Sequence, residues 1–296
     1  MARYVLILLL LVATGCEKLR EGVVRDIQFP EHEPLLAITT RIGEGDPAVI
    51  ATVYQSASVL DPEGSVPAAD AVVTVSWGGA VRWSWSGSDG MLEAVLTEPW
   101  SWETGQEVVL EGEAPGLPSV VAREIVPPSA EGAAVALIGA DTVLTPWIEE
   151  PMVQDFVQVD LVNHEGVDDW YLIQVEEYSE LGGSVWFPLW AEPDLATGER
   201  LEFNFIAQGF LISDLGLDQT PFNNFTFINS RFPEDLVPTQ RVRITALSEA
   251  LYQHYVSLAA NAASAGNPFA EPASVFGNMD GGFGVMGLTR ELILPL

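Results

Sequence analysis

Hydrophobic and polar residues alternate in short runs over residues 35–128, and turn-forming residues separate the runs. Val73, Val75 and Trp77 fall on one face of one run, and Trp83 and Trp85 do the same in the next. This period of two is typical of half-buried β-strands. It predicts strands at 35–42, 49–56, 71–77, 81–86, 91–96, 107–113 and 119–125. Short strands with turns such as SGSDG and APGLP between them predict an immunoglobulin-like β-sandwich over 35–128.

Two prolines, Pro127 and Pro128, are followed by small residues and predict a domain boundary. A second β-rich domain is expected over residues 133–296. Its predicted strands are 156–162, 170–178, 184–191, 200–208, 223–230, 241–247 and 290–294. The first two are expected to pair as a hairpin around the turn at 163–166. The predicted fold class is therefore mainly β, with two domains.

One segment of the second domain has the period of a helix. Its apolar stripe consists of Leu251, Tyr255, Leu258, Ala259 and Ala262. Ser248 is a suitable N-cap and Gly266 a suitable stop, so a helix is predicted over 249–264, packed across the sheet. Residues 267–287 follow as a long loop rich in Gly, Pro and Asn. A loop of this length in a compact domain is usually functional or fixed by its own side chains.

This loop resembles the C-terminal signature of the DUF4249 family. The matching residues are Gly266, Asn267, Pro268, Phe269, Ala270, Glu271, Pro272, Asn278, Gly282, Gly284 and Gly287. Met279 and Met286 replace the usual Ile and Phe. The segments WYLIQVEEY and FNNFTFINSRFPED are also similar to the family. The resemblance implies an outer-membrane lipoprotein of Bacteroidetes-type bacteria, with a TonB-dependent transporter as the expected partner.

The first residues resemble a bacterial lipoprotein signal. Arg3 precedes an apolar run at 4–12, and small residues stand just before Cys16. The run is too short to span a bilayer, so residues 1–15 are predicted to be a signal peptide. The resemblance implies that Cys16 is lipidated, that 16–34 is a tether, and that the protein is anchored in the outer membrane at the cell surface. A plain secretory signal with an incidental cysteine is the alternative.

The composition is strongly acidic, with 42 Asp and Glu against 12 Lys and Arg and a net charge of −30. Such a chain repels nucleic acids and anionic membrane surfaces, so no nucleic-acid partner is expected. The charge suits an acidic, soluble surface, or alternatively a face that binds divalent ions or a basic partner. Because Cys16 is the only cysteine, the chain cannot form an intramolecular disulfide.

The candidate sites for chemistry in the sequence are few. Residues 282–287 match G-x-G-x-x-G, but they follow a loop and no helix comes after them, so a nucleotide site is not predicted. Asn278 and Asp280 resemble part of a calcium loop, yet Thr289 stands where the bidentate Glu is needed. Glu271 could contribute to another oxygen-rich cation site; otherwise Asn278 and Asp280 bond to the backbone of the turn.

No catalytic arrangement stands out. His32, His164 and His254 lack metal-ligand spacing, and no G-x-S-x-G motif occurs. Adjacent carboxylates are expected by chance among 42 acidic residues. We therefore predict that the protein is not an enzyme and that it has no cofactor.

Two clusters of tryptophan leave two interpretations open. Trp83, Trp85, Trp100 and Trp102 form one cluster, and Trp186 and Trp190 the other. They belong either to the core or to an exposed surface that stacks on a glycan or peptide ligand. The predicted function is accessory to a transporter, in nutrient capture or gating. The alternatives are a glycan-binding or adhesion module, or a structural component of a cell-surface assembly.

Overall fold

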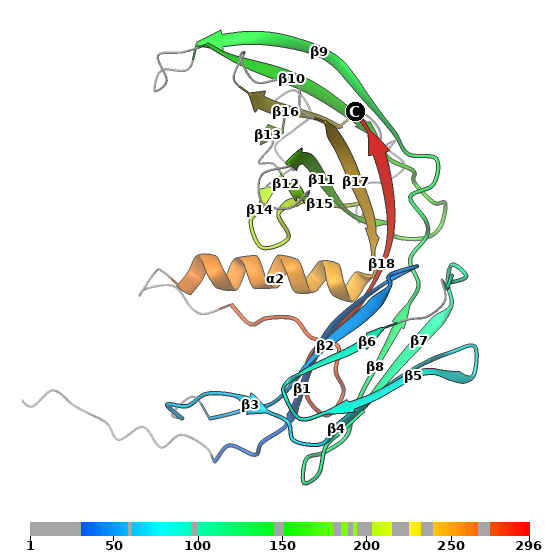
Figure 1. Ribbon diagram of the computed structural model, residues 1–296, viewed down its shortest axis with the longest axis vertical. Helices are drawn as coiled ribbons and strands as arrows, with labels where there is room; N and C mark the ends of the chain where they lie inside the picture. Colours follow the sequence, from blue (N-terminus) through cyan, green and yellow to red (C-terminus); the bar gives the residue numbers. More distant parts are fainter. Residues whose placement is uncertain are drawn as a thin grey trace, which may run out of the picture. The chain divides into compact units, whose positions relative to one another are not determined.

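Most of the described chain is β-strand. The computed structural model describes residues 31–58, 61–95, 100–144, 151–179, 185–188, 192–193, 203–214, 225–231, 239–265 and 273–296. Within these ranges the chain forms strands β1 to β18 and one helix, α2 (Figure 1). The predicted mainly β fold is confirmed. All these elements belong to the compact unit Pro34–Leu296, while Met1–Glu33 forms another unit.

The largest sheet contains ten strands and runs through the whole of this unit. Its order is β14 (Phe203–Asn204), β15 (Gly209–Ser213), β11 (Trp170–Ser179), β17 (Gln240–Leu247), β18 (Phe283–Pro295), β1 (Leu36–Gly43), β2 (Ala48–Gln55) and β3 (Val66–Pro67). In addition, β12 (Val185–Pro188) pairs with β11, and β6 (Met91–Val95) pairs with β2. The pair of β1 with β18 is parallel, and every other described pair of strands is antiparallel.

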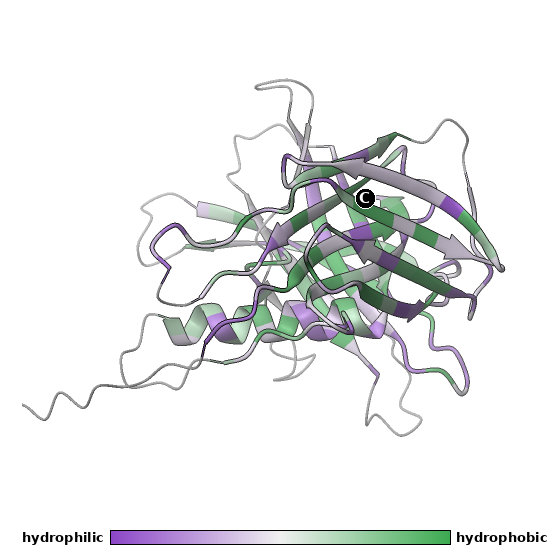
Figure 2. Cartoon of the chain, turned by 90° about the horizontal axis from the view of Figure 1, so that it is seen from below, coloured by the Kyte–Doolittle hydropathy of each residue, from purple (hydrophilic) through white to green (hydrophobic). Residues whose placement is uncertain are grey.

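Two four-stranded sheets pack against this large sheet. One has the order β5 (Ala80–Gly87), β4 (Ala71–Trp77), β7 (Glu107–Glu113) and β8 (Val120–Ile125). The other has the order β13 (Glu192–Pro193), β16 (Phe225–Arg231), β10 (Pro151–Asp160) and β9 (Ala134–Leu144). Hydrophobic and hydrophilic residues alternate along the strands, as Figure 2 shows. Each sheet therefore turns one apolar face inward, and the result is two cores.

Strand β18 contributes to both cores. Met286 and Leu288 are buried in the first core, beside residues of β1 and β4. Leu292 and Leu294 pack against the second core, which includes residues of β10, β11 and β17. The predicted boundary at Pro127 therefore lies between the two cores in the sequence, but the C-terminal strand returns to the first core.

Helix α2 (Glu249–Ala265) lies where the sequence predicts a helix, and it packs on the outer face of the large sheet. Leu251 of the helix is buried against Leu172 of β11 and Leu247 of β17. The neighbouring β11 residues Ile173 and Val175 face the second core instead. Alternate residues of β11 thus bury against opposite layers. No helix within the described ranges has both the length and the apolar content to cross a bilayer.

The predicted hairpin of 156–162 with 170–178 is wrong. Strand β10 pairs with β9 and β16, whereas β11 pairs with β12, β15 and β17 in the large sheet. Val157 and Val159 of β10 meet Tyr171 and Ile173 of β11 in one core. The two strands bury their apolar faces against each other, which requires two stacked sheets rather than one ladder.

The structure differs from the sequence-based expectations in three other places. Strand β9 was not predicted, because most of its residues are exposed and no alternation is visible. Residues 200–208 were predicted to be one strand, but their described part contains only β14 and a turn before β15. The predicted loop of 267–287 ends earlier than expected, since strand β18 begins at Phe283 and pairs with β1. The sequence does not reveal this part of the strand, because its glycines interrupt the hydrophobic alternation.

Candidate functional site

We refer to the described part of the predicted loop, residues 273–287, as the motif segment, and its first residues are fixed along helix α2. Four polar residues of α2 face it at intervals of about one turn: His254, Ser257, Asn261 and Ser264. The Phe276 N–H donates to Ser257 Oγ (2.8 Å), and Asn261 Nδ2 donates to the Ala273 carbonyl (2.6 Å). His254 Nδ1 lies 2.8 Å from the Phe276 carbonyl and therefore carries the proton. The bonds from α2 all go to backbone atoms of the segment, so they do not depend on the side chains of the segment.

Asn278 closes the turn of the motif segment onto β18. Its Oδ1 accepts the Met286 N–H (2.9 Å), and its Nδ2 donates to the Met286 carbonyl (3.0 Å). The Asn278 N–H donates to the Gly284 carbonyl (3.2 Å). The Asp280 backbone pairs with Val121 of β8 through two hydrogen bonds. Asn278 thus bonds to the backbone, and the Asp280 side chain remains exposed.

The motif glycines lie where other backbones or side chains come very close. Gly284 has a φ of +104°, and a Cβ there would overlap the Ile38 carbonyl oxygen. A Cβ at Gly282 would overlap the Leu36 carbonyl oxygen, and one at Gly287 would lie 2.7 Å from the Leu251 side chain. The positive φ and the close approach of β1 explain the glycine at 284. Gly284 and Gly287 belong to strand β18, and Gly282 directly precedes it, so these glycines do not form a loop that opens a helix as a phosphate site requires.

Glu124 connects β8, the start of α2 and the motif segment. Its carboxylate accepts hydrogen bonds from the backbone N–H groups of Ile125 and Ala250 and from Asn278 Nδ2. Burial raises the pKa of Glu124 from 4.5 to about 7, and the nearby charge of Glu249 also raises it, while the hydrogen bonds lower it. A carboxylate from another strand therefore bonds to the N-terminus of α2.

The Ser248 side chain does not cap the helix as the sequence predicted. The Ser248 carbonyl accepts the Tyr252 N–H, which is the first bond of the helix. However, the Ser248 hydroxyl accepts the Leu288 N–H of β18 (3.1 Å). The predicted capping residue is thus at the right place, but its hydroxyl joins the helix to the sheet.

Four tryptophans form a cluster at the first core: Trp77, Trp83, Trp100 and Trp102. Trp102 is buried, and the other three are half-buried and pack against the core. Most of the ring pairs are edge-to-face, at centroid distances of 4.4–6.3 Å. Trp85 also packs on this core. The structure therefore brings Trp83, Trp100 and Trp102 together, and it adds Trp77.

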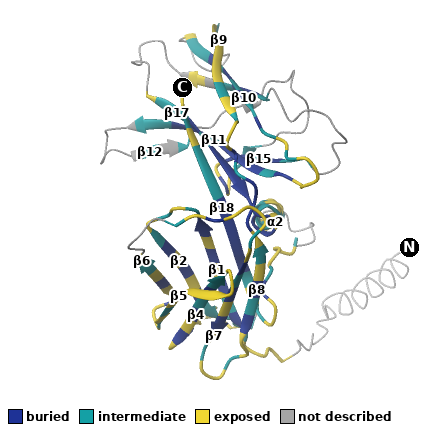
Figure 3. Ribbon diagram, turned by 90° about the vertical axis from the view of Figure 1, so that its right-hand side faces the viewer, coloured by how far each residue is buried: buried dark blue, intermediate teal, exposed yellow. Residues whose placement is uncertain are grey.

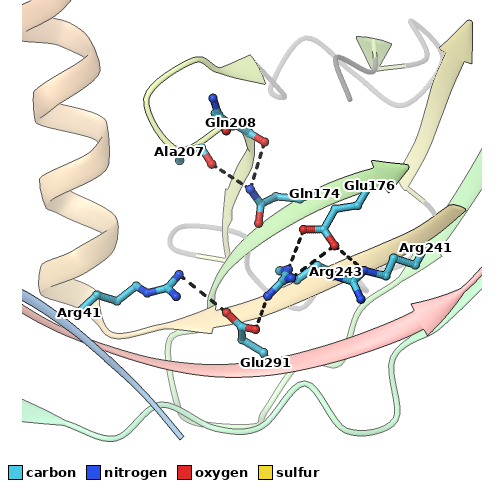
Figure 4. A network of polar contacts seen from close by, with 8 residues as sticks. All are labelled: Arg41, Gln174, Glu176, Ala207, Gln208, Arg241, Arg243 and Glu291. Atoms are coloured by element: carbon cyan, nitrogen blue, oxygen red, sulfur yellow. Dashed lines mark hydrogen bonds and ion pairs between the residues drawn. The ribbon is translucent and has the colours of Figure 1, made fainter. Parts of the chain in front are cut away.

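A cluster of arginine and glutamate side chains on the outer face of the large sheet was not predicted (Figure 4). The buried Glu176 of β11 pairs with Arg241 and Arg243 of β17. Glu291 of β18 pairs with Arg243 and, at 3.8 Å, with Arg41 of β1. Burial acts to lower the pKa of Arg243, but the two carboxylates raise it overall. The arginine–glutamate cluster thus ties four strands together through their side chains.

Aromatic rings cover part of the arginine–glutamate cluster. The Arg241 guanidinium lies 3.9 Å from the centroid of the Trp186 ring, and Trp186 packs beside Tyr178. Gln174 donates to the carbonyls of Ala207 and Gln208 in the turn before β15. Each of the three arginines of the cluster has a carboxylate partner, although they share only two glutamates.

The comparison with protein families gives a clear result. The model of the domain of unknown function DUF4249 matches residues 25–292, which is well over half of the chain. The chain belongs to the DUF4249 family. No curated protein matches it. The DUF4249 match covers both cores, the motif segment and nearly all of β18.

Several predicted features of this DUF4249 protein lie outside the described residues. They are Cys16, the signal peptide, most of the tether, and Gly266, Asn267, Pro268, Phe269, Ala270, Glu271 and Pro272. Within the described ranges, no group of three or more His, Cys, Asp or Glu residues could hold a metal ion. The predicted cation site near Asn278 depended on Glu271 and stays a prediction.

Three titratable side chains, His164, Asp169 and Asp214, lie close together near the start of β11. His164 Nδ1 is 3.0 Å from the buried Asp169, and the Asp169 N–H donates to Asp214 (2.8 Å). Burial raises the pKa of Asp214, and the charges of Asp169 and Asp168 raise it further. Apart from the short spacing of His164 and Asp169, this contact could not be predicted, because Asp214 lies 45 positions further along the chain.

Proposed function

We propose that this DUF4249 protein is a non-enzymatic, lipid-anchored accessory protein of the outer membrane in Bacteroidetes-type bacteria. It works with a TonB-dependent transporter in the capture or gating of a nutrient. The lipoprotein-like signal ending at Cys16 and the resemblance to the family support this proposal. Lipid chains on Cys16 would hold the protein at the membrane, since each buried methylene contributes about 0.8 kcal/mol.

The observation that most favours a docking role is the way the motif segment presents its side chains. Its backbone is fixed to α2 and to β8, while Val275, Phe276 and Phe283 are exposed. A segment with a fixed backbone loses little conformational entropy when a partner binds. Exposed apolar side chains on such a segment are typical of a protein–protein contact. The motif segment is therefore the proposed contact with the transporter.

Glycan binding has less support as an alternative. The rings of the tryptophan cluster contact one another edge to face and pack on the first core. Stacking on a sugar needs a free ring face. Arg82 already lies 5.5 Å from the centroid of Trp77. The cluster thus resembles core packing more than a ligand platform.

The test is to purify the tagged protein from its native membranes in mild detergent and to identify the co-purifying proteins by mass spectrometry. A β-barrel transporter in stoichiometric amount is expected. The variants Phe276→Asp and Phe283→Asp should reduce its recovery, because a charge would have to be buried in the contact. Val81→Asp, at an exposed position of β5, is the matched control and should retain the transporter.

Recovery of the protein alone, under conditions in which other membrane complexes survive, would contradict the proposed partnership. Equal recovery of the transporter with Phe276→Asp, Phe283→Asp and Val81→Asp would keep the partnership but would exclude the motif segment as the contact. The variant Cys16→Ser tests the anchor separately. It should move the protein from the membrane fraction to the soluble fraction.

A further inference from the structure

Strand β9 is a long and exposed edge strand. It has 11 residues, and among the described strands it pairs only with β10. Nine of its residues are exposed, including Leu137 (58%), Ile138 (54%) and Leu144 (76%), and β9 is largely yellow in Figure 3. One side of an edge strand presents backbone N–H and C=O groups that no neighbouring strand uses. Exposed leucine and isoleucine beside such groups are unusual in a soluble protein.

The other sheet edges in the described chain are protected in ways that β9 is not. The large sheet ends in β3 and β14, and the sheet of β9 ends on its other side in β13, each with two residues. The two strands that branch from the large sheet are also short: β6 carries Glu93, and β12 carries Pro188. Strand β5 has a bulge with a charged residue, Arg82, in its pairing with β4. Strand β8 has charged residues and pairs with Asp280. Short length, charge, bulges and cover all prevent further pairing of an edge.

The sequence of β9, AVALIGADTVL, has little charge and no proline to protect its open edge. It contains no Lys, Arg or Pro, and Asp141 is its only charged residue. Its pairing with β10 does shift register, between Phe156 and Val157, so Ile138 has no residue directly opposite. Ile138 is thus the extra residue of a bulge in β9 itself, as Arg82 is in β5, but the bulged residue of β9 is apolar. The open edge of β9 is free of charge over most of its length.

We propose that β9 binds an extended segment of a partner protein, which adds a further strand to this sheet. The segment has an apolar centre with basic residues at its ends. Main-chain hydrogen bonds to β9 give the affinity, and apolar contacts with Leu137 and Ile138 fix the register. This surface is separate from the motif segment, so the inference is independent of the proposed contact with a transporter.

Charge decides which occupant is expected. A second copy of this chain would bring two molecules of net charge −30 together. The described arginines offer little relief, because those at 41, 123, 241, 243 and 290 already pair with carboxylates of the same chain. A segment with basic ends complements the net negative charge of the chain and the Asp141 carboxylate of β9. A partner of opposite charge therefore fits β9 better than another copy.

The test uses the full-length protein in detergent and a fluorescent peptide of about 13 residues, slightly longer than the 11 residues of β9, so that its charged ends extend beyond the strand. The peptide has alternating Thr and Val in its centre and two Lys at each end. Fluorescence anisotropy should show saturable binding, and hydrogen exchange should slow in residues 134–144. A peptide with Pro at central positions cannot pair and should bind at least about tenfold more weakly, as should a peptide with Glu ends.

A matched pair of uncharged variants tests the position of binding. Leu137→Ser with Ile138→Ser removes the two apolar contacts and should weaken binding at least about tenfold. Val81→Ser, on the exposed edge strand β5, should bind like the wild type. Circular dichroism checks that both variants are folded.

Three results would overturn the proposal. One is the absence of saturable binding to the lysine-flanked peptide. Another is equal binding by the wild type and by the double serine variant, or equal binding of the proline peptide. The third is a dimer in sedimentation experiments that the double serine variant abolishes, since this would assign β9 to a second copy of the chain.

Discussion

Gly284 has a φ of +104° and lies against the Ile38 carbonyl, so a side chain there meets both strain and overlap. Asn278 satisfies both backbone groups of the buried Met286. Glu124 bonds to the start of α2 from another strand. In each case one side chain, or the lack of one, controls a backbone contact, and for Gly284 and Glu124 the contact joins segments that are distant in the sequence. Single substitutions at these positions should therefore have large effects on stability.

Gly284→Ala should reduce the free energy of unfolding by about 3 kcal/mol or more, because β18 has to move away from β1. Urea denaturation measures the change. Gly139→Ala in β9 is the matched control, since a Cβ there meets nothing within 4 Å. It should change the free energy of unfolding by about 0.5 kcal/mol at most. Equal effects of the two substitutions would show that the close approach of β1 and β18 is not important.

Glu124→Gln should change how stability depends on pH. The pKa of Glu124 is raised from 4.5 to about 7 in the folded protein, so the folded state holds this proton more tightly than the unfolded state. Its contribution to stability is fully present below about pH 4.5 and is lost as the pH rises through about 7. Relative to the wild type, the glutamine variant should therefore gain about 1–3 kcal/mol at about pH 8 compared with about pH 5.

Chemical denaturation at the two pH values measures this difference for Glu124→Gln. Glu111→Gln, on the exposed side of β7, corrects for the loss of one negative charge from a very acidic chain. If Glu124→Gln and Glu111→Gln have the same effect at both pH values, then Glu124 is not the buried carboxyl that the structure shows.

Among the elements, the strands in which apolar and polar residues alternate could be predicted, but the strands with which they pair could not. The predicted ranges 71–77 and 107–113 coincide with β4 and β7, because Val73, Val75 and Leu110 alternate with polar residues and face one core. Strand β9 could not be predicted, since it lacks a buried face. The hairpin of 156–162 with 170–178 was wrong, because the sequence pattern shows which face is apolar but not which strand lies opposite.

The candidate sites were predictable only where residues are close in the sequence. Trp83, Trp100 and Trp102 stand near one another in the sequence, and their rings are also in contact in the structure. The arginine–glutamate cluster was missed, because Glu176, Arg243 and Glu291 come from three strands far apart in the sequence. A weak signal existed in Arg241 and Arg243, two cations at the spacing of one strand face.

Glu176→Gln tests how far this cluster joins the strands. The substitution leaves Arg241 and Arg243 without their shared, buried carboxylate and should reduce the free energy of unfolding by about 2–4 kcal/mol. The exposed pair of Glu107 with Arg123 is the control. Glu107→Gln should cost about 0.5 kcal/mol or less in urea denaturation. A small effect at Glu176 would mean that solvent screens the cluster despite its burial.

In the whole molecule, β18 makes the first core dependent on the C-terminal part of the chain. Residues 35–128 were predicted to form a domain, but Met279, Met286 and Leu288 belong to the same core as their strands. Without the chain from Met279 onward, strand β1 loses its parallel partner β18, and this core loses three buried side chains. The fragment of residues 34–128 should therefore fail to fold alone, as circular dichroism and the dispersion of its NMR signals would show.

Joining residues 273–289 to the fragment 34–128 through a flexible linker should restore a cooperative unfolding transition. The same fusion with Gly284→Val is the control and should remain unfolded, because the valine side chain would overlap Ile38. Cooperative folding of the fragment 34–128 alone would show that its strands form an independent domain and that β18 only adds to it.

The pairing of β1 with β18 also has a consequence for synthesis. Glu44 and Arg290 form an ion pair although 246 positions separate them in the sequence. Contacts of this range form late, because most of the chain must be present before they can close. Strand β1 therefore pairs with β18 only after nearly the whole chain has been synthesised. A chain that is terminated even shortly before Phe283 lacks part of the first core and is expected to remain incompletely folded.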